Sequence, residues 1–235
     1  MERYEWLCPT VFLKNTMQEH LKEGSTMQNK FSEVITTEAQ FREVLGHPSH
    51  YVIDKVVSTL DEHCRAFIAK SPFVLLASAD ARGDVDISPK GDPPGFVQVL
   101  DDHTLAIPDR PGNRRADTFR NILQNPKVGL FFLIPGKQET LRVSGTTMIV
   151  RDLWLRERLM MQGKIPNFAL VVAIEEAFFH CAKCIIRSHL WEADHWPSLD
   201  GLPSLARAMV AHGKLAESVE ALQGLIDKNA REELY

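Results

Sequence analysis

The chain has 235 residues, a formal net charge of −4 at pH 7, and 44% hydrophobic and 25% charged residues. This composition is typical of a globular protein, and the slight acidic excess argues against general binding along nucleic-acid phosphates. Four cysteines are too few for a disulfide framework in a chain of this length, and the amino terminus lacks a signal-peptide pattern. We therefore expect a reducing, cytoplasmic location.

The first part of the chain predicts an arm followed by helices. Residues 1–30 are mixed and polar, and we expect them to form a peripheral arm. Thr37 and Gln40 match a capping box that begins a helix, and Gly46 is a suitable end for it. Apolar residues then recur at helical spacing across 52–68, which predicts one helix that packs against the core.

The middle of the chain predicts short strands that are joined by turns. Apolar runs bounded by Gly, Pro and Asp predict strands over 73–78, 85–88, 96–100, 104–107, 127–134, 139–151 and 168–174. Helical patterns cover 114–124 and 152–161. Because regular helices do not separate the strands, we predict a mainly β (α+β) fold built on an antiparallel barrel, and not a parallel repeat.

A basic loop follows the strand predicted over 104–107 and precedes a predicted helix. It contains Arg110, Arg114 and Arg115 together with Gly112 and Asn113. Backbone N–H groups and the helix dipole favour an anion at such a place, and guanidinium groups can bind it through two hydrogen bonds. A solvated basic loop is the alternative. Because cations are unfavourable at a helix N-terminus, the pair of arginines favours a bound phosphate.

The ordered set of segments resembles the pyridoxamine 5′-phosphate oxidase-related, flavin-binding split barrels over roughly residues 65–195. The segments that carry the resemblance are 73–80, 84–91, 110–115, 125–132, 141–145 and 180–191. The resemblance implies FMN bound at a homodimer interface and redox chemistry carried out by the flavin. It further implies an FMN-binding split-barrel domain with N-terminal helices over 31–200. Two short helical patterns, split by Gly213, predict a helical tail over 201–235 that packs on the barrel or on the partner.

The resemblance also implies roles for individual residues, each of which could instead be an ordinary surface or packing residue. The strand 85–90 resembles the one that lies along the isoalloxazine ring, and Arg114 and Arg115 resemble the pair that holds the phosphate. The residues assigned to the cofactor in this way are Asp86, Ile87, Ser88, Pro89, Lys90, Ile107, Pro108, Arg114, Arg115, Thr140, Arg187 and Trp191. Of these, Thr140, Arg187 and Trp191 resemble residues near the contact with the partner subunit.

Two other clusters contain residues that can bind metals. His180, Cys181 and Cys184 include a Cys-x-x-Cys pair, but zinc usually needs a second pair, and the strand–helix–strand context of a thioredoxin-like site is missing. We favour a packing role for this cluster. The segment from His189 to His195 lacks a helical His-Glu-x-x-His arrangement. The sequence therefore predicts no metal site.

The function expected from this reading is that of an FMN-dependent oxidoreductase, a dimer acting on a small molecule. The catalytic residue, the substrate and the electron donor are not assigned, and oxidation of pyridoxamine 5′-phosphate is not implied by the residues present. One alternative is a flavin-binding or flavin-storage protein without catalysis. Another is a split barrel that holds a deazaflavin, or haem with His180 or His103 as the axial ligand.

Overall fold

A computed structural model describes residues 30–235, and the chain divides into two compact units, residues 1–50 and 51–235. The arm predicted over 1–30 falls almost entirely outside the described residues. The helices are α2 (Glu38–Leu45), α3 (His50–Asp54), α4 (Glu62–Lys70), α5 (Asp117–Gln124), α6 (Leu153–Arg158), α7 (Lys183–Arg187), α8 (Leu205–Gly213) and α9 (Val219–Glu232), with a short 3-10 helix over Ala193–His195. The strands are β1 (Phe73–Ala79), β2 (Val85–Gly91), β3 (Gln98–Asp101), β4 (Thr104–Pro108), β5 (Lys127–Leu133), β6 (Thr140–Val150) and β7 (Ala169–His180).

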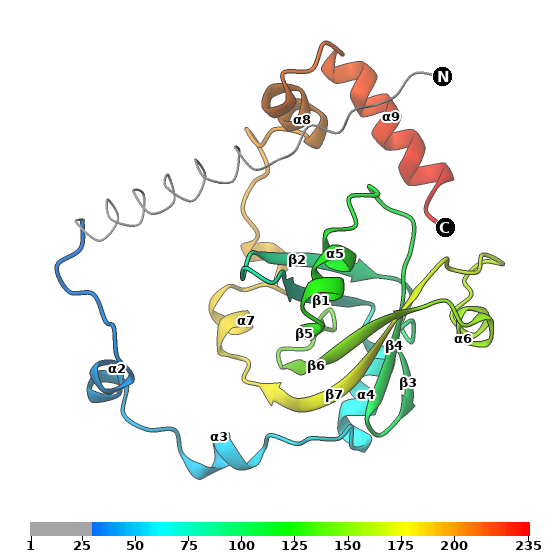
Figure 1. The fold of residues 1–235 in the computed structure, drawn as a ribbon. Helices are drawn as coiled ribbons and strands as arrows, with labels where there is room; N and C mark the ends of the chain where they lie inside the picture. Colours follow the sequence, from blue (N-terminus) through cyan, green and yellow to red (C-terminus); the bar gives the residue numbers. More distant parts are fainter. Residues whose placement is uncertain (1–29) are drawn as a thin grey trace, which may run out of the picture. The chain divides into compact units, whose positions relative to one another are not determined.

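The seven strands described in residues 30–235 form one sheet in the order β2-β1-β5-β6-β7-β4-β3 (Figure 1). Every pair of neighbouring strands is antiparallel. The prediction of an antiparallel sheet in a mainly β fold with flanking helices is therefore confirmed. The order leaves β2 and β3 as the two edges, so one side of the β2 backbone has no neighbouring strand.

The prediction of one helix over 52–68 is wrong, because α3 and α4 are separate helices. Between them, Val57 forms an antiparallel bridge with Ala177 of β7, with hydrogen bonds of 2.9 and 2.7 Å in the two directions. The Asp61 side chain then accepts a hydrogen bond from the Cys64 backbone, which begins α4. The helical spacing correctly identified the face of α4 that is buried, which includes Cys64, Phe67 and Ile68.

The core lies on the inner face of the sheet. Alternate residues of β1 and β5 are buried, as expected for strands with one face on the core. Several of the intervening residues, among them Leu75 and Phe131, are apolar and only half-buried on the outer face. In the middle of β4, Leu105, Ala106 and Ile107 are all fully buried.

A bulge interrupts the pairing of β6 with β7 at Gly145. The register shifts there, because Ser144 pairs with Glu176 whereas Gly145 pairs with Ile174. A Cβ atom at Gly145 would lie 2.0 Å from the carbonyl oxygen of Ala173, so only glycine fits this close approach. The extra residue, Glu175, accepts hydrogen bonds from Lys127 and Thr146 instead.

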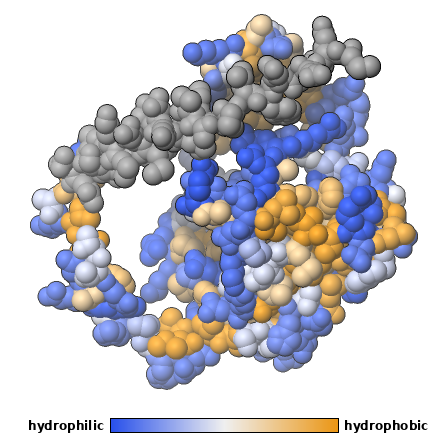
Figure 2. Space-filling model, in the orientation of Figure 1, coloured by the Kyte–Doolittle hydropathy of each residue, from blue (hydrophilic) through white to orange (hydrophobic). Residues whose placement is uncertain are grey.

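The described part of the chain contains no helix that is long and apolar enough to cross a membrane. Its cysteines Cys64, Cys181 and Cys184 are all free, which agrees with the expectation of no disulfide framework. Several large apolar side chains are exposed, including Ile87 at 61% and Trp154 at 60%. Figure 2 shows broad apolar areas on the visible face.

Candidate functional site

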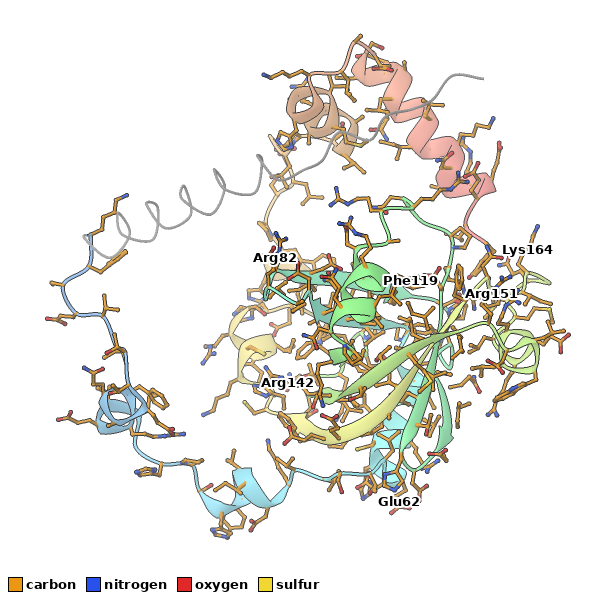
Figure 3. All side chains as sticks on the ribbon, viewed as in Figure 1. Glu62, Arg82, Phe119, Arg142, Arg151 and Lys164 are labelled. Carbon is orange, nitrogen blue, oxygen red and sulfur yellow. The ribbon has the colours of Figure 1, made fainter. Side chains whose placement is uncertain are left out.

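An open cavity of about 1760 Å³ lies where β2, the loop after β4 and the start of α5 meet. Its other walls are the loop 163–168 and residues near the end of α9 and after it. Figure 3 labels Phe119 of α5 and Lys164 of the loop 163–168, which both line the cavity. The cavity therefore joins segments that are far apart in the sequence.

Most of the residues that the sequence assigned to the cofactor line this cavity. Those brought together here are Asp86, Ile87, Ser88, Pro89, Lys90, Pro108, Arg114 and Arg115. Ile107 does not line it, because its side chain is fully buried in the core one residue before Pro108.

The other three assigned residues lie elsewhere on this chain. Thr140 is fully buried at the start of β6, and its hydroxyl has no hydrogen-bond partner within the described residues. The indole N–H of Trp191 donates to the Lys137 carbonyl oxygen at 2.8 Å, and Arg187 is exposed at the end of α7. None of these three residues lines the cavity of its own chain.

The basic loop has an unusual backbone before α5. Arg114 and Ala116 both have positive φ angles, 60° and 55°, a conformation that costs residues other than glycine roughly 1 kcal/mol or more each. The Asn113 side chain accepts a hydrogen bond from the Arg115 backbone at 3.0 Å, which stabilises the turn. Ala116 is the N-cap of α5 and offers no side-chain acceptor, so the first N–H groups of the helix are not capped by it.

The three arginines of the loop have different partners. The Arg110 guanidinium lies 2.6 Å from the Asp92 carboxylate, and these side chains are only 15% and 1% exposed, so this charge is neutralised internally. Arg115 pairs with Asp117 at 2.7 Å on the surface. Within residues 30–235, no hydrogen bond or ion pair joins the Arg114 guanidinium to another group. Arg114 is therefore the arginine of this loop that is free to bind an external anion.

Two aspartates of the cavity differ in their surroundings. The Asp86 carboxylate accepts a hydrogen bond from the Thr118 hydroxyl at 3.0 Å, which ties β2 to the first turn of α5. Burial raises the pKa of the Asp109 carboxyl, and the positive charge of Lys90 partly offsets that shift. Asp109 was not predicted as a site residue, although its position directly after Pro108 was the available signal.

The wall after α9 was also missed by the sequence analysis. The Tyr235 hydroxyl donates to the second oxygen of Asp92 at 2.6 Å, and the Arg110 guanidinium lies 5.6 Å from the centre of the tyrosine ring. The hydrogen bond to Asp92 raises the pKa of Tyr235. Because Tyr235 and Asp92 are 143 positions apart, no sequence motif could have joined them.

The histidines considered as haem ligands lie away from the cavity. Burial lowers the pKa of His180 at the end of β7, and the charges of Arg142 and Lys55 lower it further. His103 is exposed in the turn between β3 and β4. Among the described residues that line the cavity there is no His, Cys or Met.

Comparison with known proteins places the barrel region in a family. The family model described as pyridoxamine 5′-phosphate oxidase matches residues 60–181, which is more than half of the chain. No curated protein matches.

Three of the solved structures to which this chain is similar each align with about half of it. HupZ from Group A Streptococcus is 20% identical, with 51% of this chain and 92% of that chain covered and a TM-score of 0.43. A candidate pyridoxamine 5′-phosphate oxidase from Lactobacillus delbrueckii is 25% identical, with 52% and 95% covered and a TM-score of 0.43. HutZ, the haem storage protein from Vibrio cholerae, is 18% identical, with 52% and 94% covered and a TM-score of 0.35.

Proposed function

We propose that this chain, which belongs to the pyridoxamine 5′-phosphate oxidase family, binds FMN in the cavity between β2 and α5 and acts as a flavin-dependent oxidoreductase. The observation that carries the proposal is the free guanidinium of Arg114 beside the start of α5, whose N-cap supplies no side-chain acceptor. Both features face the same cavity and favour one negatively charged group.

The phosphate end of FMN fits the basic loop. Unpaired N–H groups and the positive end of the α5 dipole attract an anion, and Arg114 can bind it through two hydrogen bonds. Arg115 lies beside it, although its guanidinium is shared with Asp117. Lys90 adds a further positive charge in the cavity wall. A bound phosphate would offset the cost of placing two cations before a helix.

The ring end of FMN fits the edge of the sheet at β2. Residues 86–89 line the cavity, and the backbone of β2 is paired with β1 on one side only. Strand amides and carbonyls on the free side can therefore orient a flat heterocycle through hydrogen bonds. When bound, the flavin supplies hydride or electron transfer, and the protein contributes binding, orientation and electrostatics.

The dimer is part of the same proposal. Members of this family are commonly homodimers, and we infer that Thr140, Arg187 and Trp191 meet the cofactor of the partner subunit. Two features support this inference. These residues do not line the cavity of their own chain, and apolar residues of β1 and β5 are only half-buried on the outer face of the sheet.

A haem-binding role has less support in this cavity. His, Met and Cys are common axial ligands of haem iron, and the described residues that line the cavity include none of them. A deazaflavin, by contrast, would present a flat ring and a phosphate to the same groups. A flavin carrier without catalysis also uses the same cavity. The spectrum and mass of the bound cofactor separate FMN, a deazaflavin and haem, and reduction by a nicotinamide cofactor separates an enzyme from a carrier.

Absorbance and mass spectrometry of the purified full chain test the identity of the cofactor. We expect flavin bands and release of FMN on denaturation. A Soret band would contradict the proposal in favour of haem, and a colourless protein that takes up no added FMN would contradict it outright. Reduction by a nicotinamide cofactor followed by reoxidation with oxygen is expected of an oxidoreductase. A carrier would show neither step.

Replacing Arg114 and Arg115 together by alanine tests the phosphate site. Hydrogen bonds to charged groups contribute about 1.5–3 kcal/mol each, so the double variant should lose about 3–6 kcal/mol of FMN binding free energy. Arg82→Ala is the matched control, because Arg82 is an exposed arginine in the turn after β1 and does not line the cavity. Equal FMN affinity in the double variant and the control, measured by fluorescence titration, would reject the assignment.

A further inference from the structure

We propose that His189, Glu192 and His195 form a binding site for a divalent transition-metal ion, such as Zn²⁺, separate from the proposed flavin cavity. Each residue offers one ligand atom, and these atoms all lie within 4.8 Å of one another. None of the three residues lines the cavity. The proposal therefore does not depend on which cofactor the cavity holds.

The distances within the cluster approach those of a metal site. One carboxylate oxygen of Glu192, Oε2, lies 3.0 Å from Nδ1 of His189 and 3.4 Å from Nδ1 of His195. Zinc binds imidazole nitrogen and carboxylate oxygen at about 2.0–2.2 Å, so neighbouring ligand atoms of a tetrahedral site are about 3.3–3.5 Å apart. Two edges of such a tetrahedron are thus nearly formed by the side chains alone.

Successive turns of the backbone bring the three residues together. The Glu192 N–H donates to the His189 carbonyl oxygen and the His195 N–H donates to the Glu192 carbonyl oxygen, both at 2.9 Å. Two tryptophans hold this segment in place: Trp191 donates to the Lys137 carbonyl oxygen, and Trp196 donates to the Leu190 carbonyl oxygen at 3.2 Å. The three ligands follow one another at a spacing of three residues, in tight turns. They therefore do not match the helical His-Glu-x-x-His pattern.

The chemistry of the cluster suits a divalent transition metal. Two imidazoles and one carboxylate are a ligand set used for Zn²⁺, and three protein ligands leave a coordination position for water. The side chains are 46%, 49% and 55% exposed, so an ion can reach them from solvent. The two imidazole rings are stacked with their centres 4.3 Å apart and an angle of 12° between them. Because each nitrogen lone pair lies in its ring plane, the rings must rotate out of this stack to bind one ion.

Isothermal titration of the metal-free full chain with Zn²⁺ tests the site. The expected result is one ion bound per chain, with affinity at least about 10-fold weaker in His189→Ala, His195→Ala and Glu192→Gln, because removal of outer-shell partners alone costs 10–100-fold. Glu192→Gln keeps a side-chain oxygen that can accept a hydrogen bond from either histidine. If Glu192 only accepts hydrogen bonds from the histidines, Glu192→Gln should leave zinc affinity unchanged. If Glu192 binds the metal ion, Glu192→Gln should weaken zinc affinity.

Two control variants make the outcome decisive. His63→Ala removes a histidine whose Nε2 lies 3.7 Å from a Glu62 oxygen, an exposed His–Glu pair outside the proposed site, and it should leave zinc binding unchanged. Replacing Cys181 and Cys184 by serine removes the exposed thiols and should also leave it unchanged. Zinc affinity that is equal in wild type and in the three ligand variants would overturn the proposal. Loss of the bound ion in the cysteine variant would overturn it as well.

Discussion

The Asp92 carboxylate in the cavity wall binds two side chains from distant parts of the chain. One of its oxygens pairs with Arg110 and the other accepts the Tyr235 hydroxyl. At 1% exposure, this charge has lost almost all contact with water, and only its partners compensate for that loss. Asp92 therefore holds the loop after β4 and the residues after α9 against the end of β2.

Replacing Asp92 by alanine should strongly destabilise the protein. The Arg110 guanidinium would be left buried without a counter-charge, and breaking a buried pair in this way costs about 3–5 kcal/mol of unfolding free energy. Asp84→Ala is the matched control, because the Arg82–Asp84 pair is about 70% exposed on both sides and should contribute less than about 1 kcal/mol. Urea denaturation measures both values. A similar, small loss in the two variants would contradict the prediction.

The pH dependence of the unfolding free energy should reveal the raised pKa of Asp109. Its raised pKa means that the folded state holds the proton more tightly than the unfolded state does. Stability is then lost as the pH rises from the pKa of unfolded aspartate, about 3.9, through the raised value. Asp109→Asn should have the higher unfolding free energy above that range, and the difference should disappear below it. Denaturation curves between pH 3 and 8 test the sign, and a constant difference would contradict it.

At the residue scale, most of the residues named from the sequence line one cavity, but their hydrogen-bond and ion-pair partners were not predicted. Arg110, Arg114 and Arg115 look alike in the sequence. Within the described residues, Arg110 has a buried partner, Arg114 has no partner, and Arg115 has a half-buried partner. The pairing of Arg110 depends on Asp92, which lies 18 residues before it, and a pairing over that distance leaves no periodic signal. The cofactor roles of these residues remain predictions.

At the element scale, the sequence predicted a strand at the position of each strand in the described residues and identified the buried face of α4, but β7 continues to His180, beyond the predicted end at 174. It failed where a tertiary contact overrides local periodicity. The break between α3 and α4 depends on the bridge from Val57 to Ala177, which are 120 residues apart. Likewise, α5 begins at Asp117 and not at 114, because Arg114 and Ala116 adopt the left-handed conformation.

The bulge in the pairing of β6 and β7 can be tested with Gly145→Ala. The new methyl group would meet the Ala173 carbonyl oxygen, so the strands must move apart. We expect this to cost about 1–3 kcal/mol of unfolding free energy. Gly129→Ala in the neighbouring strand β5 is the control, since its methyl group would lie 3.9 Å from the nearest atom, Cβ of Ala77. Thermal unfolding of the two variants gives the comparison. Equal melting temperatures would show that the bulge relaxes freely.

At the scale of the whole molecule, the sheet leaves apolar residues on its outer face. Leu75 of β1 pairs in register with Phe131 of β5, and both side chains are half-buried. A charge placed there would be tolerated in a monomer with this face in water, but not in an interface between two copies. The antiparallel fold was predictable from the strand pattern. The dimer was implied by family resemblance alone, because periodicity cannot say what covers an outer face.

Light scattering of wild type and Leu75→Arg tests the dimer. We expect the wild type to have twice the chain mass of 26.6 kDa and the variant to shift towards the single-chain mass. Buried charge without a partner is costly, so the interface should dissociate. Circular dichroism confirms that the variant keeps its sheet. A wild-type protein that stays at the single-chain mass at all concentrations would contradict the prediction, as would a folded variant that stays at twice that mass.

One wall of the cavity is formed by residues that lie outside the region matched by the family model. That region ends at residue 181, whereas Asn229, Glu233 and Tyr235 face the same space as β2 and α5. Substitutions or length changes after the barrel can thus alter the shape of this cavity. Under the proposed function, the residues after the barrel would shape access to the flavin, whereas the basic loop would hold its phosphate, so two distant stretches of the chain would give one cavity two separate properties.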